Sequence, residues 1–188
     1  MTDAAEMTPE RIAEIARSIT TPIVVVGLMG AGKSTVGRRL ATLLKKDFVD
    51  SDSAIEEAAQ RSVSEIFEQF GEPHFRDGER RVIARLIEQG TGVIATGGGA
   101  FVDLGTRALI LSSAVAVWLD CDVETLVART QRRNTRPLLR GGDPRAILTR
   151  LQRERTPAYA EAHIRIAAGD APHQQTAMRI LEAIDKWR

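Results

Sequence analysis

The sequence predicts one α/β domain, in which helices cover both faces of a mostly parallel sheet. Short apolar runs rich in β-branched residues alternate with longer segments of helical periodicity. The run at residues 23–26 is Ile-Val-Val-Val without polar alternation, which is typical of a strand buried on both faces. Polar or glycine-rich segments follow several runs, and ligands of parallel sheets bind at the carboxyl ends of the strands.

Five runs are predicted to be strands. They are residues 23–26, 48–49, 93–95, 115–119 and 164–166. With helices between them, they predict a three-layer α/β/α fold with a mostly parallel five-stranded sheet. A chain of 188 residues is long enough to give such a domain a well-buried core.

A helical extension precedes the first strand. Thr8 and Pro9 are a helix cap and a first-turn proline, and Thr20-Thr21-Pro22 ends the helix. Its apolar residues recur at helical spacing and favour packing on the domain, while an oligomer contact stays open. We therefore expect an N-terminal helical extension at residues 1–21 and a domain at residues 22–188.

Capping signals and periodicity place the other helices. Capping-box patterns begin helices at Ser53 and Ser62, and Gly90 closes a long amphipathic helix. Further helices are predicted at residues 33–44, 73–89, 123–133, 143–155 and 174–187.

Residues 27–34 match the phosphate-binding pattern G-x-x-x-x-G-K-[ST], between a predicted strand and a predicted helix. Glycines let backbone N–H groups turn inward to bind an anion, and the helix adds its positive dipole end. Lys33 would reach the β- and γ-phosphates, and the Ser34 hydroxyl would ligate Mg²⁺. The candidate nucleotide-binding residues here are Gly27, Gly30, Ala31, Gly32, Lys33, Ser34 and Thr35. The sequence thus predicts a P-loop NTPase-like fold that binds a nucleotide and Mg²⁺, although the P-loop alone does not distinguish kinases from GTPases or ATPases.

Asp50-Ser51-Asp52 ends the second predicted strand. In an extended segment the two carboxylates would point to the same side, towards the phosphate loop. One would hold Mg²⁺ directly or through water, and the other would accept a proton from a substrate hydroxyl. Helix capping by Asp52 or Ser53 is the alternative.

Two further patterns carry candidate substrate contacts. Arg76 and Glu79 share a helix face, where taken alone they favour a solvated ion pair. Gly97-Gly98-Gly99 follows a predicted strand and lets a ligand approach the backbone closely, with a plain loop as the alternative.

Residues 129–140 hold five arginines and end at Gly141-Gly142. The arginines are Arg129, Arg132, Arg133, Arg136 and Arg140. We interpret residues 129–142 as a mobile arginine-rich lid that closes over phosphates and excludes water. A solvated helix end and a nucleic-acid patch are the alternatives, although aromatic interleaving is absent.

In this order, the motifs together resemble the shikimate kinase family. They are the P-loop, D-x-D at 50–52, F-R-x-x-E at 75–79, G-G-G at 97–99, R-P-L-L at 136–139 and R-x-P-x-Y at 155–159. The resemblance spans about residues 23–187. It implies ATP-dependent phosphorylation of the 3-hydroxyl of shikimate, giving shikimate 3-phosphate and ADP in the pathway to chorismate and aromatic amino acids.

The resemblance also implies roles for single residues. The catalytic residues would be Lys33, Arg136 and Asp52, the last as candidate general base. Substrate contacts would come from Asp52, Arg76, Gly97, Gly98, Gly99 and Arg155, with both arginines at the carboxylate. Arg129, Arg136 and Gln174 would join the P-loop in binding ATP, and Ser34 and Asp50 would serve Mg²⁺.

The sequence departs from the family pattern at three places. Residues 1 to about 20 precede the family's usual first strand. Gly78 costs a helix interior about 1 kcal/mol relative to alanine. The lid between Arg129 and Arg136 is about one residue shorter than the pattern, which leaves the roles of Arg132 and Arg133 open.

Composition excludes other classes of partner. Lys and Arg number 26 against 25 Asp and Glu, so no overall field draws the chain to nucleic acid or a membrane. The single cysteine excludes an internal disulfide and fits a reducing cytosol. No apolar secretory signal is present, and the three histidines lack metal-ligand spacing and are interpreted as ordinary surface or helix residues. We expect a cytoplasmic monomer.

Two alternative functions stay open. A related kinase acting on gluconate would need similar arginines, because gluconate is also a polyhydroxy carboxylate. A catalytically silent ATP-binding regulator could have the same fold, although Lys33, Ser34 and Asp52 are intact.

Overall fold

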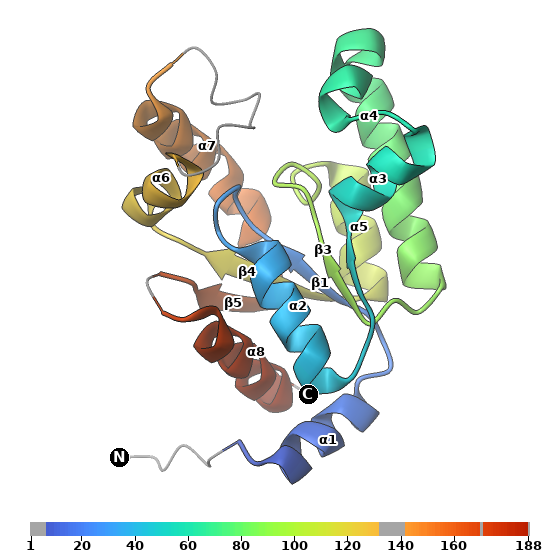
Figure 1. The fold of residues 1–188 in the computed structure, drawn as a ribbon, viewed down its shortest axis with the longest axis vertical. Coiled ribbons are helices and arrows are strands. Elements are labelled where there is room, and N and C mark those ends of the chain that lie inside the picture. The colour runs from blue at the N-terminus through green and yellow to red at the C-terminus, as the bar shows by residue number, and fades with distance from the viewer. Residues whose placement is uncertain (1–6, 132–141, 170, 188) are drawn as a thin grey trace.

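The computed structural model describes residues 7–131, 142–169 and 171–187. Within them, five strands form one sheet in the order β2-β3-β1-β4-β5, and each neighbouring pair is parallel (Figure 1). The strands are β1 (Ile23–Val26), β2 (Phe48–Asp50), β3 (Val93–Ala95), β4 (Val115–Asp120) and β5 (Ile164–Ala167). The predicted mostly parallel five-stranded sheet is confirmed, and all of its described pairings are parallel.

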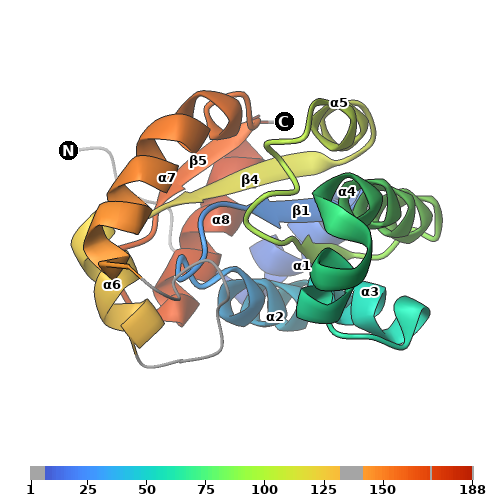
Figure 2. The same cartoon turned by 90° about the horizontal axis from the view of Figure 1, so that it is seen from above.

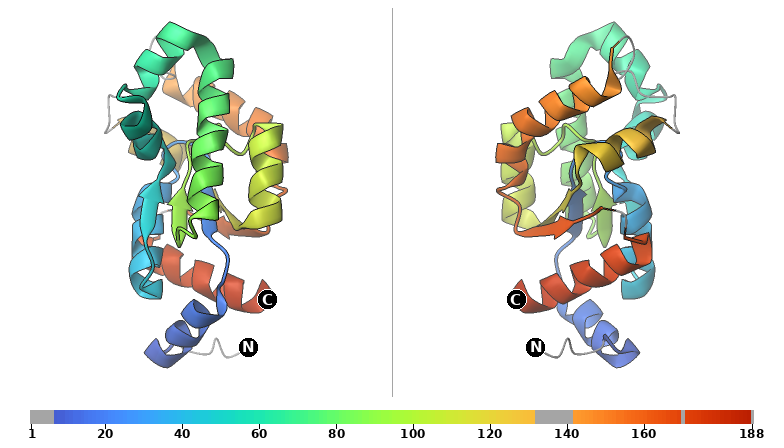
Figure 3. Two further views of the ribbon diagram at one scale, coloured as in Figure 1. Left: turned by 90° about the vertical axis from the view of Figure 1, so that its right-hand side faces the viewer. Right: turned by 90° about the vertical axis from the view of Figure 1, so that its left-hand side faces the viewer.

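The sheet is the middle of three layers, with helices on both of its faces. They are α1 (Pro9–Ser18), α2 (Lys33–Leu44), α3 (Ser51–Ala59), α4 (Val63–Glu88), α5 (Leu104–Ser113), α6 (Val123–Gln131), α7 (Pro144–Tyr159) and α8 (His173–Trp187). Figures 2 and 3 show α2 and α8 on one face, and α5 with the second half of α4 on the other. All four residues of β1 are completely buried between these layers, as their unbroken apolar run predicts.

The N-terminal helix packs on the domain beside α2 and α8 (Figure 1). Thr8 caps it through a hydrogen bond from the N–H of Arg11, as predicted. Ile15 and Ile19 are buried in the main core, and the Arg11 guanidinium pairs with Asp185 of α8 at 2.7 Å. Apolar burial, rather than the exposed ion pair, accounts for most of this attachment.

Helices α3 and α4 differ from the predictions. α3 begins at Ser51 and not at Ser53, because Asp50 is its cap. The Ser62 capping box is present, but the helix it begins continues to Glu88 across a kink at Gly71, whose backbone is non-helical (φ 79°, ψ 171°). The two predicted helices therefore form one bent element, and helical geometry continues through Gly78.

One helix was not predicted. α5 lies between β3 and β4, and its N-cap Asp103 accepts a hydrogen bond from the N–H of Thr106 at 2.8 Å. Small residues weaken its amphipathic pattern, so this cap was the only clear signal. α7 also continues beyond the predicted end at Arg155, through Pro157 to Tyr159.

The apolar side chains form two clusters. The main core lies on both faces of the sheet. A satellite cluster of Ile55, Ile66 and Phe75 holds α3 against α4, beyond the carboxyl ends of the strands (Figure 1). Among the described residues, no helix combines the length and hydropathy needed to cross a bilayer.

Candidate active site

The phosphate loop connects β1 to α2 and requires its glycines. Gly27, Gly30 and Gly32 have φ angles of +139°, +85° and +92°, which disfavour residues with a side chain. A Cβ at Gly27 would also lie 2.7 Å from the carbonyl oxygen of Leu119 in β4. Gly32 caps α2 without a side-chain hydrogen bond, so the first N–H groups of α2 stay available to an anion. The predicted strand–turn–helix context is confirmed.

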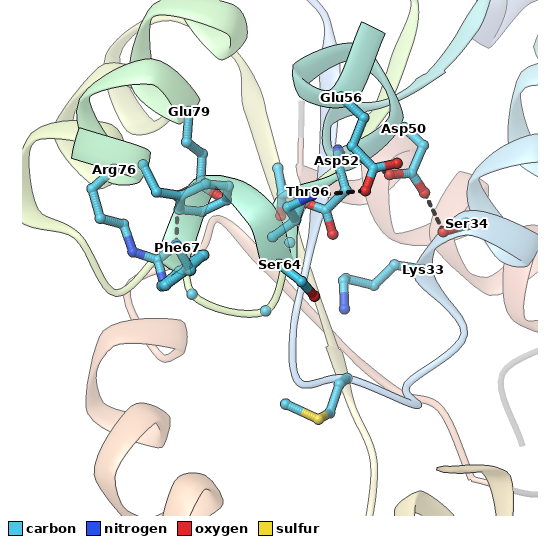
Figure 4. Close-up of a pocket in the computed structure, with 16 residues that line it drawn as sticks. Lys33, Ser34, Asp50, Asp52, Glu56, Ser64, Phe67, Arg76, Glu79 and Thr96 are labelled. Carbon is cyan, nitrogen blue, oxygen red and sulfur yellow. Dashed lines mark hydrogen bonds and ion pairs between the residues drawn. The ribbon is translucent and has the colours of Figure 1, made fainter. Parts of the chain in front are cut away.

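Three segments meet at the carboxyl ends of neighbouring strands. β2, β3 and β1 are neighbours, and their registers align Asp50 and Val25 with Ala95. The D-x-D segment, the triple glycine and the P-loop therefore emerge side by side. They surround a cavity of about 360 Å³ (Figure 4). Its lining includes Lys33, Ser34, Asp50, Asp52, Arg76, Glu79 and residues 97–99.

The nucleotide side of this cavity carries a lysine and a hydroxyl–carboxylate pair. Lys33 is buried, and its ammonium donates to the carbonyl oxygen of Leu28 at 2.9 Å. The Ser34 hydroxyl donates to the Asp50 carboxylate at 2.5 Å. In Figure 4 the side chains of Lys33 and Asp52 point into the same space. A hard hydroxyl and a carboxylate are donors that suit Mg²⁺, which keeps several waters and also binds phosphate oxygens.

Asp50 and Asp52 line the same cavity, as predicted. The prediction that they do so because both lie in an extended segment was wrong. Asp52 lies in the first turn of α3 and not in an extended segment, and the Asp50 carboxylate accepts a hydrogen bond from its N–H at 3.1 Å. Asp50 is therefore the cap, rather than Asp52 or Ser53. Burial, followed by the negative charge of Asp50, raises the pKa of Asp52.

Arg76 and Glu79 form a partly buried ion pair, so the prediction of a solvated ion pair was wrong. Glu79 is fully buried, and Arg76 Nη1 lies 2.6 Å from its Oε2. The exposed Glu72 also holds the guanidinium at 3.2 Å. Glu79 Oε1 has no hydrogen-bond partner among the described residues and faces Gly97. Glu79 thus positions Arg76 beside the cavity.

Because Arg76 is a predicted substrate contact, the Glu79 carboxyl predicts a pH dependence of binding of the substrate that accepts the phosphoryl group, called the acceptor below. Burial raises the pKa of Glu79 from 4.5 to about 7. Acidification below pH 7 therefore protonates it and removes the charge that holds Arg76. We expect acceptor affinity, measured by titration, to fall between pH 8 and pH 6 in the wild type. Glu79→Gln should bind weakly at both values, while Glu72→Gln should keep the dependence; a pH-independent wild type would contradict this.

The effect of the same group on stability has the opposite sign. Because the folded pKa of Glu79 lies above 4.5, the folded chain holds this proton more tightly than the unfolded chain. Its contribution to the free energy of unfolding is therefore most favourable below pH 4.5 and is lost as pH rises through 7. Low pH therefore favours the contribution of Glu79 to the free energy of unfolding, but it weakens the ion pair between Glu79 and Arg76.

The triple glycine is required by close side chains and not by its backbone angles. A Cβ at Gly97 would lie 2.7 Å from Asp52 Oδ1, and one at Gly99 would overlap the Arg76 guanidinium. The carbonyl oxygen of Gly98 accepts hydrogen bonds from Arg155 at 2.9 Å and from Tyr159 at 2.5 Å. Arg76, Arg155 and Gly99 also line an adjoining cavity of about 580 Å³.

Gly99→Ala is expected to weaken acceptor binding. The new methyl group would displace the Arg76 guanidinium, whereas the P-loop is untouched. We expect the KM for the acceptor to rise about tenfold or more, with little change in the KM for ATP. Gly78→Ala is the matched control, because no atom lies within 4 Å of its added methyl. Equal acceptor KM values for the two variants would refute this role of Gly99.

The structure places Arg129 beside the P-loop. Its guanidinium donates to the carbonyl oxygens of Gly169 at 2.7 Å and Ala31 at 3.4 Å. Gln174 is exposed in the first turn of α8, next to His173. Arg136 and most of the predicted lid lie outside the described residues.

Two histidines that were predicted to be ordinary surface or helix residues make contacts within the domain. His173 is half-buried against the P-loop, where a Cβ at Gly32 would lie 3.3 Å from its Cε1. His163 Nδ1 accepts a hydrogen bond from the N–H of Ala116 at 3.0 Å. His173 is the first residue of α8, which agrees with the helix alternative of that prediction, while the contact of His163 with β4 was not predicted. Cavity residues such as Thr96 and Phe67 were also missed.

Comparisons with known proteins agree with this geometry. The shikimate kinase family model matches residues 29–185. The shikimate kinase of Novosphingobium aromaticivorans is 57% identical over 98% of both chains. That of Rhodopseudomonas palustris is 48% identical over 99% of this chain and 92% of the relative.

The chain belongs to the shikimate kinase family. Membership establishes shikimate kinase activity, with ATP as the phosphoryl donor.

Solved structures of the family have the same fold. Shikimate kinase from Acinetobacter baumannii, in complex with shikimate, has a TM-score of 0.86 and 37% identity over 91% of this chain and 97% of that one. A gluconokinase from Sinorhizobium meliloti covers 89% of this chain and 93% of its own at a TM-score of 0.61 and 16% identity, which shows a shared fold alone.

Proposed function

We propose that this cleft transfers the γ-phosphoryl group of ATP to the 3-hydroxyl of shikimate, with Asp52 as general base. The observation that carries the proposal is the single cavity that Lys33, Asp52 and Arg76 all line. It brings a phosphate-binding lysine, a buried carboxylate and a carboxylate-binding guanidinium within the reach of one small molecule. That combination fits a polyhydroxy carboxylate as the phosphoryl acceptor.

The nucleotide would be held by the P-loop. Backbone N–H groups at the start of α2, together with Lys33, bind the phosphates, and Arg129 contacts the adenosine side with Gln174 nearby. Ser34 and Asp50 would hold Mg²⁺, which neutralises phosphate charge when it is bound. Arg136 of the lid would approach the transferred group, a role that remains a prediction from the motif.

The acceptor would lie across the triple glycine. Arg76 and Arg155 converge on the adjoining cavity at Gly99, where they would bind the carboxylate. That orientation directs the ring hydroxyls to Asp52, whose raised pKa makes it a better proton acceptor than an exposed aspartate. The bare backbone of Gly97 and Gly98 leaves room for the ring.

In-line transfer from this arrangement depends on positioning and charge. Asp52 orients and deprotonates the hydroxyl, and Lys33 stabilises the charge on the phosphoryl group. We propose further that residues 22–188 are the kinase domain and residues 1–21 its extension, and that the protein acts as a cytoplasmic monomer without a nucleic-acid or membrane partner.

The test is ADP release with MgATP and no acceptor, shikimate or gluconate. Phosphorus–proton correlation NMR then locates the new phosphate ester. We expect release with shikimate alone and coupling of the phosphate to the proton at C3. Coupling elsewhere, or release with gluconate only, would overturn the proposal, and ATP binding without release would favour a silent regulator.

A further inference from the structure

A second hollow lies between α3 and the two halves of α4, and it shares one side chain with the catalytic cavity. Its volume is about 380 Å³, within the usual range for small-molecule sites. α3, the first half of α4 and the second half of α4 each contribute to its wall, so the bend at Gly71 shapes it. We call it the outer groove. Phe75 lines both this groove and the catalytic cavity.

The floor of the outer groove is apolar. The satellite cluster of Ile55, Ile66 and Phe75 forms it, and these side chains are buried. Phe70 stands at the rim with 49% of its surface exposed, which is unusual for a large apolar side chain. An apolar or aromatic body would bury this surface.

Two arginines and a histidine surround the apolar floor. Arg61, His74 and Arg81 line the outer groove, and no Asp or Glu is among its lining residues in the described part of the chain. Arg81 pairs with Asp77, but no described carboxylate lies within ion-pair distance of Arg61. The Arg61 guanidinium instead lies 5.8 Å from the centre of the Phe70 ring. Arg61, whose charge also acts on Glu65, is therefore the rim cation that would contact an anion.

Gly78 keeps the outer groove open. A glycine in a helix interior costs about 1 kcal/mol relative to alanine. Gly78 has no positive φ, and no atom lies within 4 Å of the position its Cβ would take. Neither backbone geometry nor crowding within the chain thus requires this glycine. The space that a side chain would fill faces the groove, which Gly78 lines.

We propose that the outer groove is a second ligand site, which takes a small carboxylate with an apolar body. The apolar floor binds the body, and Arg61 binds the carboxylate at the rim. The site is distinct from the acceptor cleft, because Phe75 separates the two cavities.

The test uses 3-phenylpropionate as probe, observed by saturation-transfer NMR with the full chain. Saturating shikimate and ADP keep the probe out of the catalytic cleft. Gly78→Ala and Gly78→Leu form a matched pair, since both gain similar helix propensity but only leucine fills the groove. Equal thermal stability and basal kinase activity of the pair would show that both are folded.

We expect saturable binding to the wild type and to Gly78→Ala, and binding about tenfold weaker or worse to Gly78→Leu. Arg61→Gln, or replacement of the probe by 3-phenylpropanol, should weaken binding roughly threefold to fivefold. Binding that Gly78→Leu leaves unchanged, equal binding of the alcohol, or no saturable binding would overturn the proposal. A dimer in solution that Gly78→Leu dissociates would also overturn it, because a second copy would then occupy the groove.

Discussion

Asp52→Asn is expected to remove most of the turnover while ATP affinity stays unchanged. The substitution keeps the shape of the side chain but removes the charge and the proton-accepting oxygen. Loss of a general base costs on the order of a hundredfold to ten-thousandfold in rate. Asp52 extends from the first turn of α3, whereas the ATP phosphates would bind backbone N–H groups of the P-loop.

Two measurements separate these effects. The kcat comes from shikimate-dependent ADP release, and the Kd for ATP comes from titration. Glu56→Gln is the matched control, because Glu56 is another carboxylate that lines the same cavity. We expect the control to keep most of its turnover. Unchanged turnover in Asp52→Asn would remove this residue from the role of base.

Arg155→Ala is expected to raise the KM for shikimate far more than the KM for ATP. Arg155 is half-buried and held to the carbonyl oxygen of Gly98 at 2.9 Å, next to the Arg76 guanidinium in the adjoining cavity. Its removal would leave the acceptor carboxylate with one arginine. The expected increase is on the order of a hundredfold, as for the loss of one partner of a buried charged pair.

Arg153→Ala is the control for this variant. Arg153 lies on the same helix, α7, but is exposed, so it controls for the loss of charge and helix propensity. Steady-state kinetics with each substrate varied in turn provide the comparison. Equal increases in the two KM values would assign Arg155 to a general structural role.

The nucleotide side of the fold was predictable because its signals are local. The unbroken apolar run of β1, the glycine spacing and the start of α2 follow one another in the chain, and the structure has all three. The sheet was predictable for the same reason, since short apolar runs between helices leave few arrangements. The contact between Arg136 and the phosphates remains a prediction.

The acceptor side was harder to predict because its geometry depends on tertiary contacts. Asp52 was assigned to an extended segment, although the Asp50 carboxylate caps a helix that begins at Ser51, two residues before the predicted start. The burial of Glu79 cannot be inferred from its spacing to Arg76, which a solvated pair shares. The need for glycine at position 99 depends on where the guanidinium of Arg76 lies, and Arg76 is 23 positions earlier in the chain. The local sequence around Gly99 does not show that contact.

The satellite cluster of Ile55, Ile66 and Phe75 has a consequence for local stability. Three buried side chains, apart from the main core, hold α3 against α4. Separating α3 from the part of α4 that packs on it should therefore cost less free energy than global unfolding. The amide protons of these two segments should exchange with solvent sooner than those of β1, and acceptor binding should slow that exchange. Part of the acceptor's binding energy would then order the groups that recognise it.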